Sequence, residues 1–308
     1  MTICIAAIHE SDQDKEPSKR TRTIIATFDR RLSTAGGAHS ADGAAWKMAK
    51  LYGKWTGLIA GNVSEMTVIV DAVRAETKKS SRLGWREISR QCGKAYREER
   101  KRLIETEILT DYDIDSYPEY LSLKVSDREL FDAIGERIEL FDANLNLLIF
   151  GFDNHNDPHI FSIVGNGKIQ YCDIQSHGVA GSGAWAATVA LDRYPYNKWK
   201  PIGECIYAVL AAKFAAESAE GVGRETELYL FTEDHPHGTG GRLGAENIEV
   251  IKGMWKALPR IPVGIADNLE KAVGVTKLAI EEFKRNRKIE KPRFVVGASL
   301  ILHSTIQA

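Results

Sequence analysis

The chain opens with short apolar runs and then changes to a helical period. Runs of apolar and β-branched residues at 2–8, 23–28 and 54–60 have the length and composition of strands. Apolar positions then recur every three or four residues over 66–73, and again from 85 to about 108. The first third of the chain therefore predicts three strands followed by two amphipathic helices.

The rest of the chain returns to strands and then repeats this order. An acidic, loop-like stretch at 110–119 and a short helix at 127–140 lead into it. Gly, Asn, Asp and Pro cluster between the next strand-like runs, as is typical of turns. In chain order we expect strands at 145–152, 160–164, 168–172 and 178–180, helices at 184–191 and 202–218, strands at 227–231 and near 248–251, a helix at about 266–285 and a last strand at 294–302.

The order of elements indicates the fold class. It is neither the regular alternation of a βαβ protein nor the pattern of an all-β protein. Strands, two helices, strands, two helices and strands favour two sheets stacked face to face, with a helix pair on each outer side. We therefore expect an α+β fold with the four layers of an αββα sandwich.

Composition narrows the classes of function. The 308 residues are 44% hydrophobic with a net charge of −1, which gives no general reason to expect nucleic acid or an anionic membrane as a partner. No apolar run reaches the roughly 18 residues of a membrane span, and the N-terminus lacks the features of a signal peptide. The four cysteines lack disulfide or metal-site spacing and suit a reducing compartment, so we expect a cytoplasmic protein.

Loop histidines and a glycine-rich loop are the candidate cofactor sites of the sequence. His155 and His159, like His235 and His237, stand in loops without Cys or carboxylate partners at ligand spacing. The Gly-Thr-Gly-Gly run at 238–241 follows a strand but lacks the helical continuation of a phosphate-binding loop. We therefore expect neither a metal nor another cofactor.

The start of the chain carries the first candidate chemistry. Thr2 follows Met1 directly and begins an apolar run. Threonine is small enough that removal of Met1 is expected, and removal leaves Thr2 with a free α-amine. One residue then holds both a hydroxyl nucleophile and an amine that accepts a proton near neutral pH.

Several sequence blocks stand in a recognisable order. They are TICI at 2–5, ATFDRR at 26–31, AAWKMAKLYGKWTGLIAGNVSE at 44–65, and LLIFGFD at 147–153 with GVAGSGAWAATVALD at 178–192. In order and spacing this set resembles the proteasome β-subunit group of N-terminal nucleophile (Ntn) hydrolases, including its bacterial relatives. The resemblance spans about residues 1–234. It implies the αββα Ntn-hydrolase fold, a threonine-type endopeptidase and a polypeptide substrate.

The resemblance also assigns catalytic roles. Thr2 would attack the scissile carbonyl, and its α-amine, through a water, would carry the proton to the leaving amine. Lys47 matches the family lysine whose charge favours the alkoxide, and Asp29 matches its carboxylate partner. Gly61 matches the glycine whose N–H stabilises the oxyanion, and Ser182 the serine beside the N-terminal amine.

One departure and a substrate pocket follow from the same comparison. Glu217 and Glu220 stand where the family often has Asp-x-x-Ser near the end of a helix, and we count Glu217 with the catalytic set. The positions that match the pocket for the residue before the cleaved bond are apolar, which predicts a preference for apolar side chains. The substrate-binding residues implied in this way are Ala45, Ala49, Ile59 and Val63, together with Thr34, which matches a residue that pairs with the substrate backbone.

The family implies assembly as well, since its subunits enclose their sites in rings or related oligomers. We expect a homo-oligomer, with residues 1–245 as the hydrolase domain and 246–308 as a C-terminal extension packed on this domain or on a neighbouring subunit. The insertions at 10–22 and 110–140 have no assigned role. The sequence does not indicate whether an ATPase is a partner. Two alternatives stay open: an Ntn amidase that acts on a small-molecule amide, and a non-catalytic structural ring subunit.

Overall fold

The computed structural model of the chain describes residues 2–11, 13, 15–16, 20–33, 40–41, 47–78, 83–234 and 241–257. These residues hold seven α-helices and two antiparallel sheets of four and five strands, with a two-stranded ribbon. The protein thus contains both helices and sheets, as predicted from the strand-like and helix-like runs of the sequence. None of the helices in these residues combines the length and apolar character that a membrane span requires.

The first sheet is built around the N-terminal strand. Its order is β10 (His177–Ala180), β1 (Cys4–Glu10), β2 (Arg22–Asp29) and β11 (Thr226–Thr232), with antiparallel neighbours throughout. Both faces of β1 are buried, which explains its continuous apolar sequence. Its side chains still alternate between two core clusters, Ile5 and Ala7 on one side and Cys4, Ala6 and Ile8 on the other.

The second sheet has β7 at its centre. Strands β7 and β8 form the hairpin that the run of turn residues between them predicts. Strand β5 was not predicted from the sequence. β5 is an edge strand of this sheet, and its residues are mostly half-exposed, so its sequence lacks a long apolar run. In spatial order the strands are β5 (Met48–Tyr52), β6 (Trp55–Gly61), β7 (Leu145–Phe152), β8 (Pro158–Val164) and β9 (Lys168–Tyr171), and the separate ribbon pairs β3 (Leu32–Ser33) with β4 (Ser40–Ala41).

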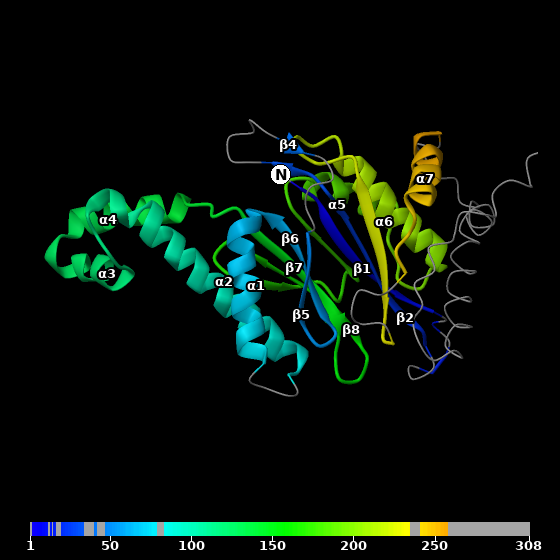
Figure 1. The fold of residues 1–308 in the computed structure, drawn as a ribbon, viewed down its shortest axis with the longest axis horizontal. Helices are drawn as coiled ribbons and strands as arrows, with labels where there is room; N and C mark the ends of the chain where they lie inside the picture. Colours follow the sequence, from blue (N-terminus) through cyan, green and yellow to red (C-terminus); the bar gives the residue numbers. More distant parts are fainter. Residues whose placement is uncertain are drawn as a thin grey trace, which may run out of the picture.

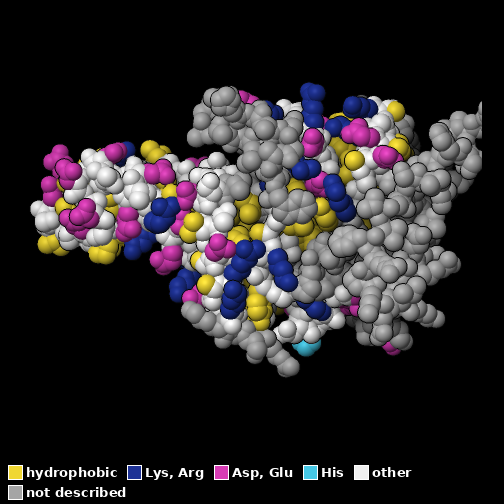
Figure 2. Space-filling view, viewed as in Figure 1, with side chains coloured by type: hydrophobic (Ala, Val, Ile, Leu, Met, Phe, Trp, Pro, Cys, Tyr) yellow, Lys and Arg dark blue, Asp and Glu magenta, His cyan; other side chains and the backbone are white. Residues whose placement is uncertain are grey.

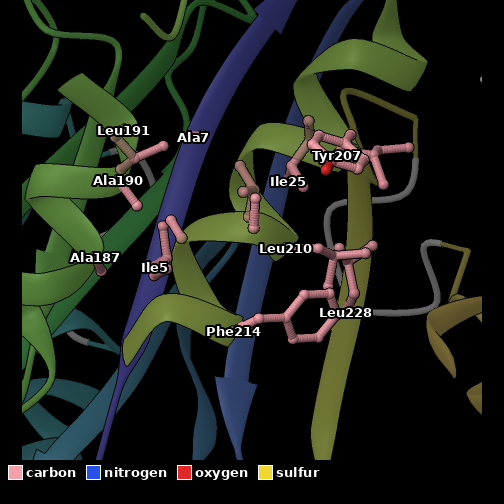
Figure 3. Close-up of a cluster of buried hydrophobic side chains, with 14 of the residues drawn as sticks. Ile5, Ala7, Ile25, Ala187, Ala190, Leu191, Tyr207, Leu210, Phe214 and Leu228 are labelled. Atoms are coloured by element: carbon pink, nitrogen blue, oxygen red, sulfur yellow. The ribbon is translucent and has the colours of Figure 1, made fainter. Parts of the chain in front are cut away.

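The two sheets pack against each other, and helices cover their outer faces. Phe28, Leu148 and Phe150 belong to the apolar layer between the sheets. A second cluster joins the first sheet to its helices, where Ile5 and Leu210 lie in the same layer (Figure 3). The helices are α1 (Val63–Thr77) and α2 (Trp85–Glu107) on the second sheet, and α5 (Ala184–Arg193) and α6 (Ile202–Ala216) on the first (Figure 1).

Beyond the second sheet, α2 continues into a helical arm. A 3-10 turn (Leu109–Tyr112), α3 (Tyr117–Ser126) and α4 (Arg128–Leu140) complete this arm around a core of its own that includes Tyr120 and Ile134. α3 and α4 project from the body of the molecule (Figure 1), and acidic side chains are spread over their visible surface (Figure 2). The insertion expected at 110–140 is therefore a helical hairpin with a separate hydrophobic core.

The loop expected at 110–119 is wrong in part, because α3 begins inside it. Ser116 caps the helix by accepting a hydrogen bond from the Glu119 N–H at 3.4 Å, and Pro118 lies in the first turn. A serine followed three residues later by glutamate, with proline near the first helical position, is a known signal for a helix start. The acidic composition of the stretch obscured this signal.

The strand expected near 248–251 is also wrong. These residues belong to α7 (Ala245–Ala257), which packs on α6. Ile248 and Ile251 are both buried by that packing, and their spacing of three is helical, a period that a window of four residues does not reveal. The expected helix at 266–285 and strand at 294–302 lie outside the described residues, so α7 represents the C-terminal extension here.

Candidate active site

A buried polar cluster lies where β1 and β2 meet the start of β5. The Thr2 hydroxyl donates a hydrogen bond to Asp29 Oδ1 and accepts one from Lys47 Nζ. Lys47 also forms an ion pair with Asp29, with 3.0 Å between Nζ and Oδ1. All three side chains are at most 2% exposed. The structure thus brings together the predicted nucleophile, its lysine and its carboxylate.

The Asp29 carboxylate is held by backbone as well as by side chains. Oδ1 accepts the Ile3 N–H at 2.8 Å, and Oδ2 accepts the Gly223 N–H at 3.0 Å and the Arg31 N–H at 3.2 Å. A buried carboxylate is stable only when its lone pairs are satisfied and its charge is balanced. These donors and Lys47 supply both, and they fix the orientation of Asp29 at the end of β2.

Main-chain pairing places Lys47 beside this carboxylate. The Ile59 N–H donates to the Lys47 carbonyl at 2.8 Å, which extends the β5–β6 ladder by one residue. The charges of Lys47 and Asp29 also act on the neighbouring Cys4 thiol. Burial raises the pKa of this thiol, Lys47 lowers it and Asp29 raises it further. The backbone of Lys47 is therefore paired with β6, and its side chain is buried against the Asp29 carboxylate. A solvent-facing strand lysine would have neither feature.

The backbone of Thr2 is held by the Gly-Ser-Gly turn before α5. The Thr2 N–H donates to Ser182 Oγ at 3.1 Å, and the Gly183 N–H donates to the Thr2 carbonyl at 3.3 Å. At Gly181 φ is +106°, and a Cβ there would lie 2.3 Å from the Thr2 carbonyl oxygen. Glycine is thus required for this close approach. Ser182 lies beside the Thr2 nitrogen, as the resemblance implies.

Gly61 ends β6 in a conformation that favours glycine. Its φ is +103°, and a Cβ would overlap the Asn144 carbonyl oxygen at 1.9 Å. The residue lies two positions beyond Ile59, which pairs with Lys47. Among the described residues no hydrogen bond links Gly61 to Thr2, so its role as oxyanion donor stays a prediction.

Two of the predicted substrate-binding residues lie on the same side of the second sheet as Lys47. Ile59 lies opposite Lys47, and Ala49 follows it by two, so both share its face. Ile59 is buried in the cluster between this sheet and α1, and Ala49 packs against that cluster. The side chain of Val63, at the start of α1, is not described, and Thr34 and Ala45 lie outside the described residues.

Glu217 is not part of the Thr2 cluster. Its carboxylate accepts hydrogen bonds from Lys213 Nζ at 2.5 Å and from Lys252 Nζ at 3.0 Å, and the structure gives it no contact with Thr2, Asp29 or Lys47. The expected direct catalytic role therefore has no geometric support. Sequence reasoning missed Lys213, although a lysine four residues before a glutamate on an apolar helix is the available signal.

The expectation that His159 stands in a loop without a carboxylate partner is wrong, because this residue lies in β8 beside Asp173 and Asp153. His159 Nδ1 lies 2.7 Å from Asp173 Oδ2, and its ring stacks on Trp85 at 4.5 Å between centroids. Within the described residues no group of three or more His, Cys, Asp or Glu side chains is arranged to hold a metal ion. His235 and His237 lie outside those residues.

Comparison with known proteins identifies the fold. No family model matches the chain, and no curated protein matches it in sequence. Among similar solved structures are an Anbu mutant from Hyphomicrobium sp. strain MC1, with 16% identity, a TM-score of 0.56 and coverage of 96% of this chain and 100% of that chain. Another is Anbu, an ancestral beta-subunit, from Yersinia bercovieri, with 15% identity, a TM-score of 0.55 and coverage of 85% and 98%. The chain therefore shares its fold with these Anbu structures.

Proposed function

We propose that this chain is a threonine-type peptide hydrolase in which Thr2, after removal of Met1, is the nucleophile. The observation that carries the proposal is the buried Thr2 hydroxyl between Asp29 and Lys47. The finer architecture that goes with it is the four-layer αββα sandwich of the Ntn hydrolases, formed by residues 1–245. The coarse likeness to Anbu supports that architecture.

The first chemical step uses the charge of Lys47. An ammonium that donates to the Thr2 hydroxyl oxygen stabilises the alkoxide that forms as the proton leaves. Asp29, fixed by three backbone N–H groups, holds Lys47 and the hydroxyl on the same carboxylate oxygen. This arrangement orients the nucleophile before a substrate binds, which removes reorientation from the reaction barrier.

The α-amine of Thr2 would act as the base. The nitrogen lies 3.1 Å from Ser182 Oγ, so the serine holds the group that must take the hydroxyl proton, through a water, and return it to the leaving amine. Attack forms an ester between Thr2 and the acyl half of the substrate, and a water molecule then hydrolyses this ester. The free amine exists only if Met1 has been removed, which makes processing the decisive condition.

Specificity and assembly complete the proposal. The apolar positions Ala49 and Ile59, on the face that carries Lys47, support a preference for apolar side chains before the cleaved bond. We also propose a self-compartmentalising homo-oligomer, since a protease with an open site would endanger other proteins. The four free, buried cysteines support a cytoplasmic location.

Intact-protein mass spectrometry after treatment with an epoxyketone tests the proposal. We expect the mass of the chain without Met1 plus one adduct. Thr2→Ser keeps the hydroxyl and should still react, whereas Thr2→Ala should not. Retention of Met1 without an adduct would reject the hydrolase and favour the structural ring subunit. A panel of fluorogenic peptides beside small acyl amides then separates a peptidase from an amidase.

A further inference from the structure

A second buried lysine lies behind Asp29. Lys213 of α6 is fully buried, and its Nζ donates to Glu217 Oε1 at 2.5 Å, to the Gly223 carbonyl at 3.0 Å and to the Arg224 carbonyl at 3.2 Å. Burial lowers the pKa of Lys213, and the Glu217 carboxylate opposes that effect. An ammonium inside an apolar layer is costly, so these three acceptors must hold it in place.

The peptide units of Gly223 connect this lysine with the candidate active site. The Gly223 carbonyl accepts from Lys213, and its N–H donates to Asp29 Oδ2 at 3.0 Å. Lys213 therefore restrains the residue that supplies one of the donors to Asp29. A shift of this loop would remove one of the two backbone donors to Oδ2 and would weaken the restraint on the carboxylate beside Thr2.

The C-terminal helix contributes to the same network. Lys252 of α7 lies 2.8 Å from Glu217 Oε2, so the one carboxylate joins cations from two helices. The Lys252 ammonium also lies 5.3 Å from the Phe214 ring centroid, and Trp255 packs 5.7 Å from that ring. α7 is thus attached to α6 next to the loop that reaches Asp29.

We infer that Lys252, Glu217, Lys213 and Gly223 form a positioning relay through which α7 fixes the Asp29 carboxylate against Thr2. Lys213 is the central positioning residue. The effect of the relay on catalysis rests on the proposed function as a hydrolase, whereas the contacts that link α7 to Asp29 do not depend on that function. In the relay, Glu217 does not touch Thr2 but holds the ammonium groups of Lys213 and Lys252. The relay also gives the C-terminal extension a role within its own subunit.

A merely structural lysine would not be expected here. A buried ion pair is often replaced by apolar side chains of similar size without loss of stability. Lys213→Met removes only one partner of the pair, but Lys252 still balances the Glu217 carboxylate, so the variant keeps the apolar layer around α6 and loses the ammonium. What methionine cannot do is hold the two loop carbonyls, so its effect should appear at Gly223 and Asp29.

Three variants test the relay: Lys213→Met, Lys252→Met and, as a matched control, Lys198→Met. Lys198 has a carboxylate partner too, Glu10 at 2.5 Å, but it lies outside the relay. The first measurement is hydrogen exchange at the Gly223 N–H, followed in protein labelled with ¹⁵N-glycine. The second is the rate of peptide cleavage per site that an epoxyketone titrates, since a folding defect lowers the number of sites and a positioning defect lowers the rate at each.

In Lys213→Met we expect exchange at Gly223 about tenfold faster and a rate per titrated site about 10²-fold lower, with KM unchanged. Lys252→Met should shift both in the same direction by less, and Lys198→Met should shift neither. Unchanged exchange at Gly223 in Lys213→Met overturns the relay. If that variant does not fold, unchanged exchange in Lys252→Met overturns it instead. A wild-type chain without titratable sites rejects the hydrolase, and the exchange data still decide the relay.

Discussion

Charged side chains are buried and mutually satisfied at the Thr2 site, but exposed and paired locally in the helical arm. Asp29 and Lys47 are at most 2% exposed and come from β2 and from the residue before β5. In the arm, Arg128 and Asp132 pair within one helix turn, with both side chains more than half exposed. The site therefore depends on long-range folding, whereas the arm depends on its own helices.

This difference has an energetic meaning. Removing one partner of a buried pair leaves an uncompensated charge, while an exposed pair is already screened by water. The buried core of the arm is likewise a different cluster from those around the sheets, although the partly buried Phe141 packs against both. The two regions should thus respond differently to the same kind of substitution.

The largest difference is expected between Lys47→Met and Lys101→Met. Lys47→Met should lower the free energy of unfolding by about 3–5 kcal/mol, because Asp29 is left buried and unpaired. Lys101 is itself exposed and has a half-buried partner one turn along α2, Glu105 at 3.9 Å, so its loss should cost at most about 0.5 kcal/mol. Urea unfolding of both variants measures the contrast.

A companion measurement makes the charge argument specific. Lys47→Met should also reduce epoxyketone labelling of Thr2 by at least about 10²-fold. Adding Asp29→Asn should recover part of the lost stability but none of the labelling, because it removes the unpaired charge without restoring the cation. Equal unfolding energies for Lys47→Met and Lys101→Met would mean that the cluster at Thr2 is not charged as described.

A smaller effect separates the two cores. Ile5 and Ile134 are both fully buried, the first beneath α6 and the second in the arm. Replacing either with valine should cost about 0.5–1.5 kcal/mol. In Ile134→Val the loss should appear as faster hydrogen exchange within α3 and α4 only, because those helices open as a local unit. In Ile5→Val it should appear in global unfolding.

Labelling of Thr2 provides the control for the core substitutions. It should be unaffected by Ile134→Val, since the arm core has no residue in the cluster around Thr2. Faster exchange in β1 or β2 of that variant would show that the arm and the body unfold together.

The same contrast explains which parts of the structure the sequence revealed. β1, β2 and β7 are buried on both faces, so each contains a run of apolar and β-branched residues that is easily identified. Edge strand β5 and helix α7 present mixed sequences, and they were missed or misassigned. Burial on both faces therefore made these strands easy to identify, although the exposed edge strand β9 was predicted as well.

The candidate site shows a corresponding limit. Thr2, Lys47 and Ser182 could be placed from a resemblance because each stands in a local block of sequence. Gly223 could not, since a backbone donor leaves no mark on its side chain, and the spacing of Lys213 from Glu217 indicates an ion pair but not its burial. The importance of Gly223 depends on a contact with Asp29 across 194 positions of sequence, which only the fold brings about, and Lys213 acts through Gly223.

The smallest expected effect concerns pH, and it again distinguishes the body from the arm. Burial by itself lowers the pKa of His159. Hydrogen bonds and charge interactions with Asp173 and Asp153 outweigh the effect of burial, so the pKa of His159 lies above its ordinary value of 6.5. The stabilisation from the charged ring is fully present below pH 6.5 and is lost as pH rises through the folded value. Unfolding free energy should therefore fall over this interval, and His159→Gln should remove that fall.

His177 gives a control of opposite sign, because burial lowers its pKa in spite of the Gln175 carbonyl that accepts from it. The neutral ring is favoured in the fold, so stability is lost as pH falls from 6.5 through the lower folded value. The arm, residues 109–142, contains no histidine, and its local hydrogen-exchange stability should not vary between pH 6 and 8 beyond the intrinsic exchange rate. A pH-dependent arm would show that its stability is coupled to the histidines of the body, and the separation of the two regions would then fail.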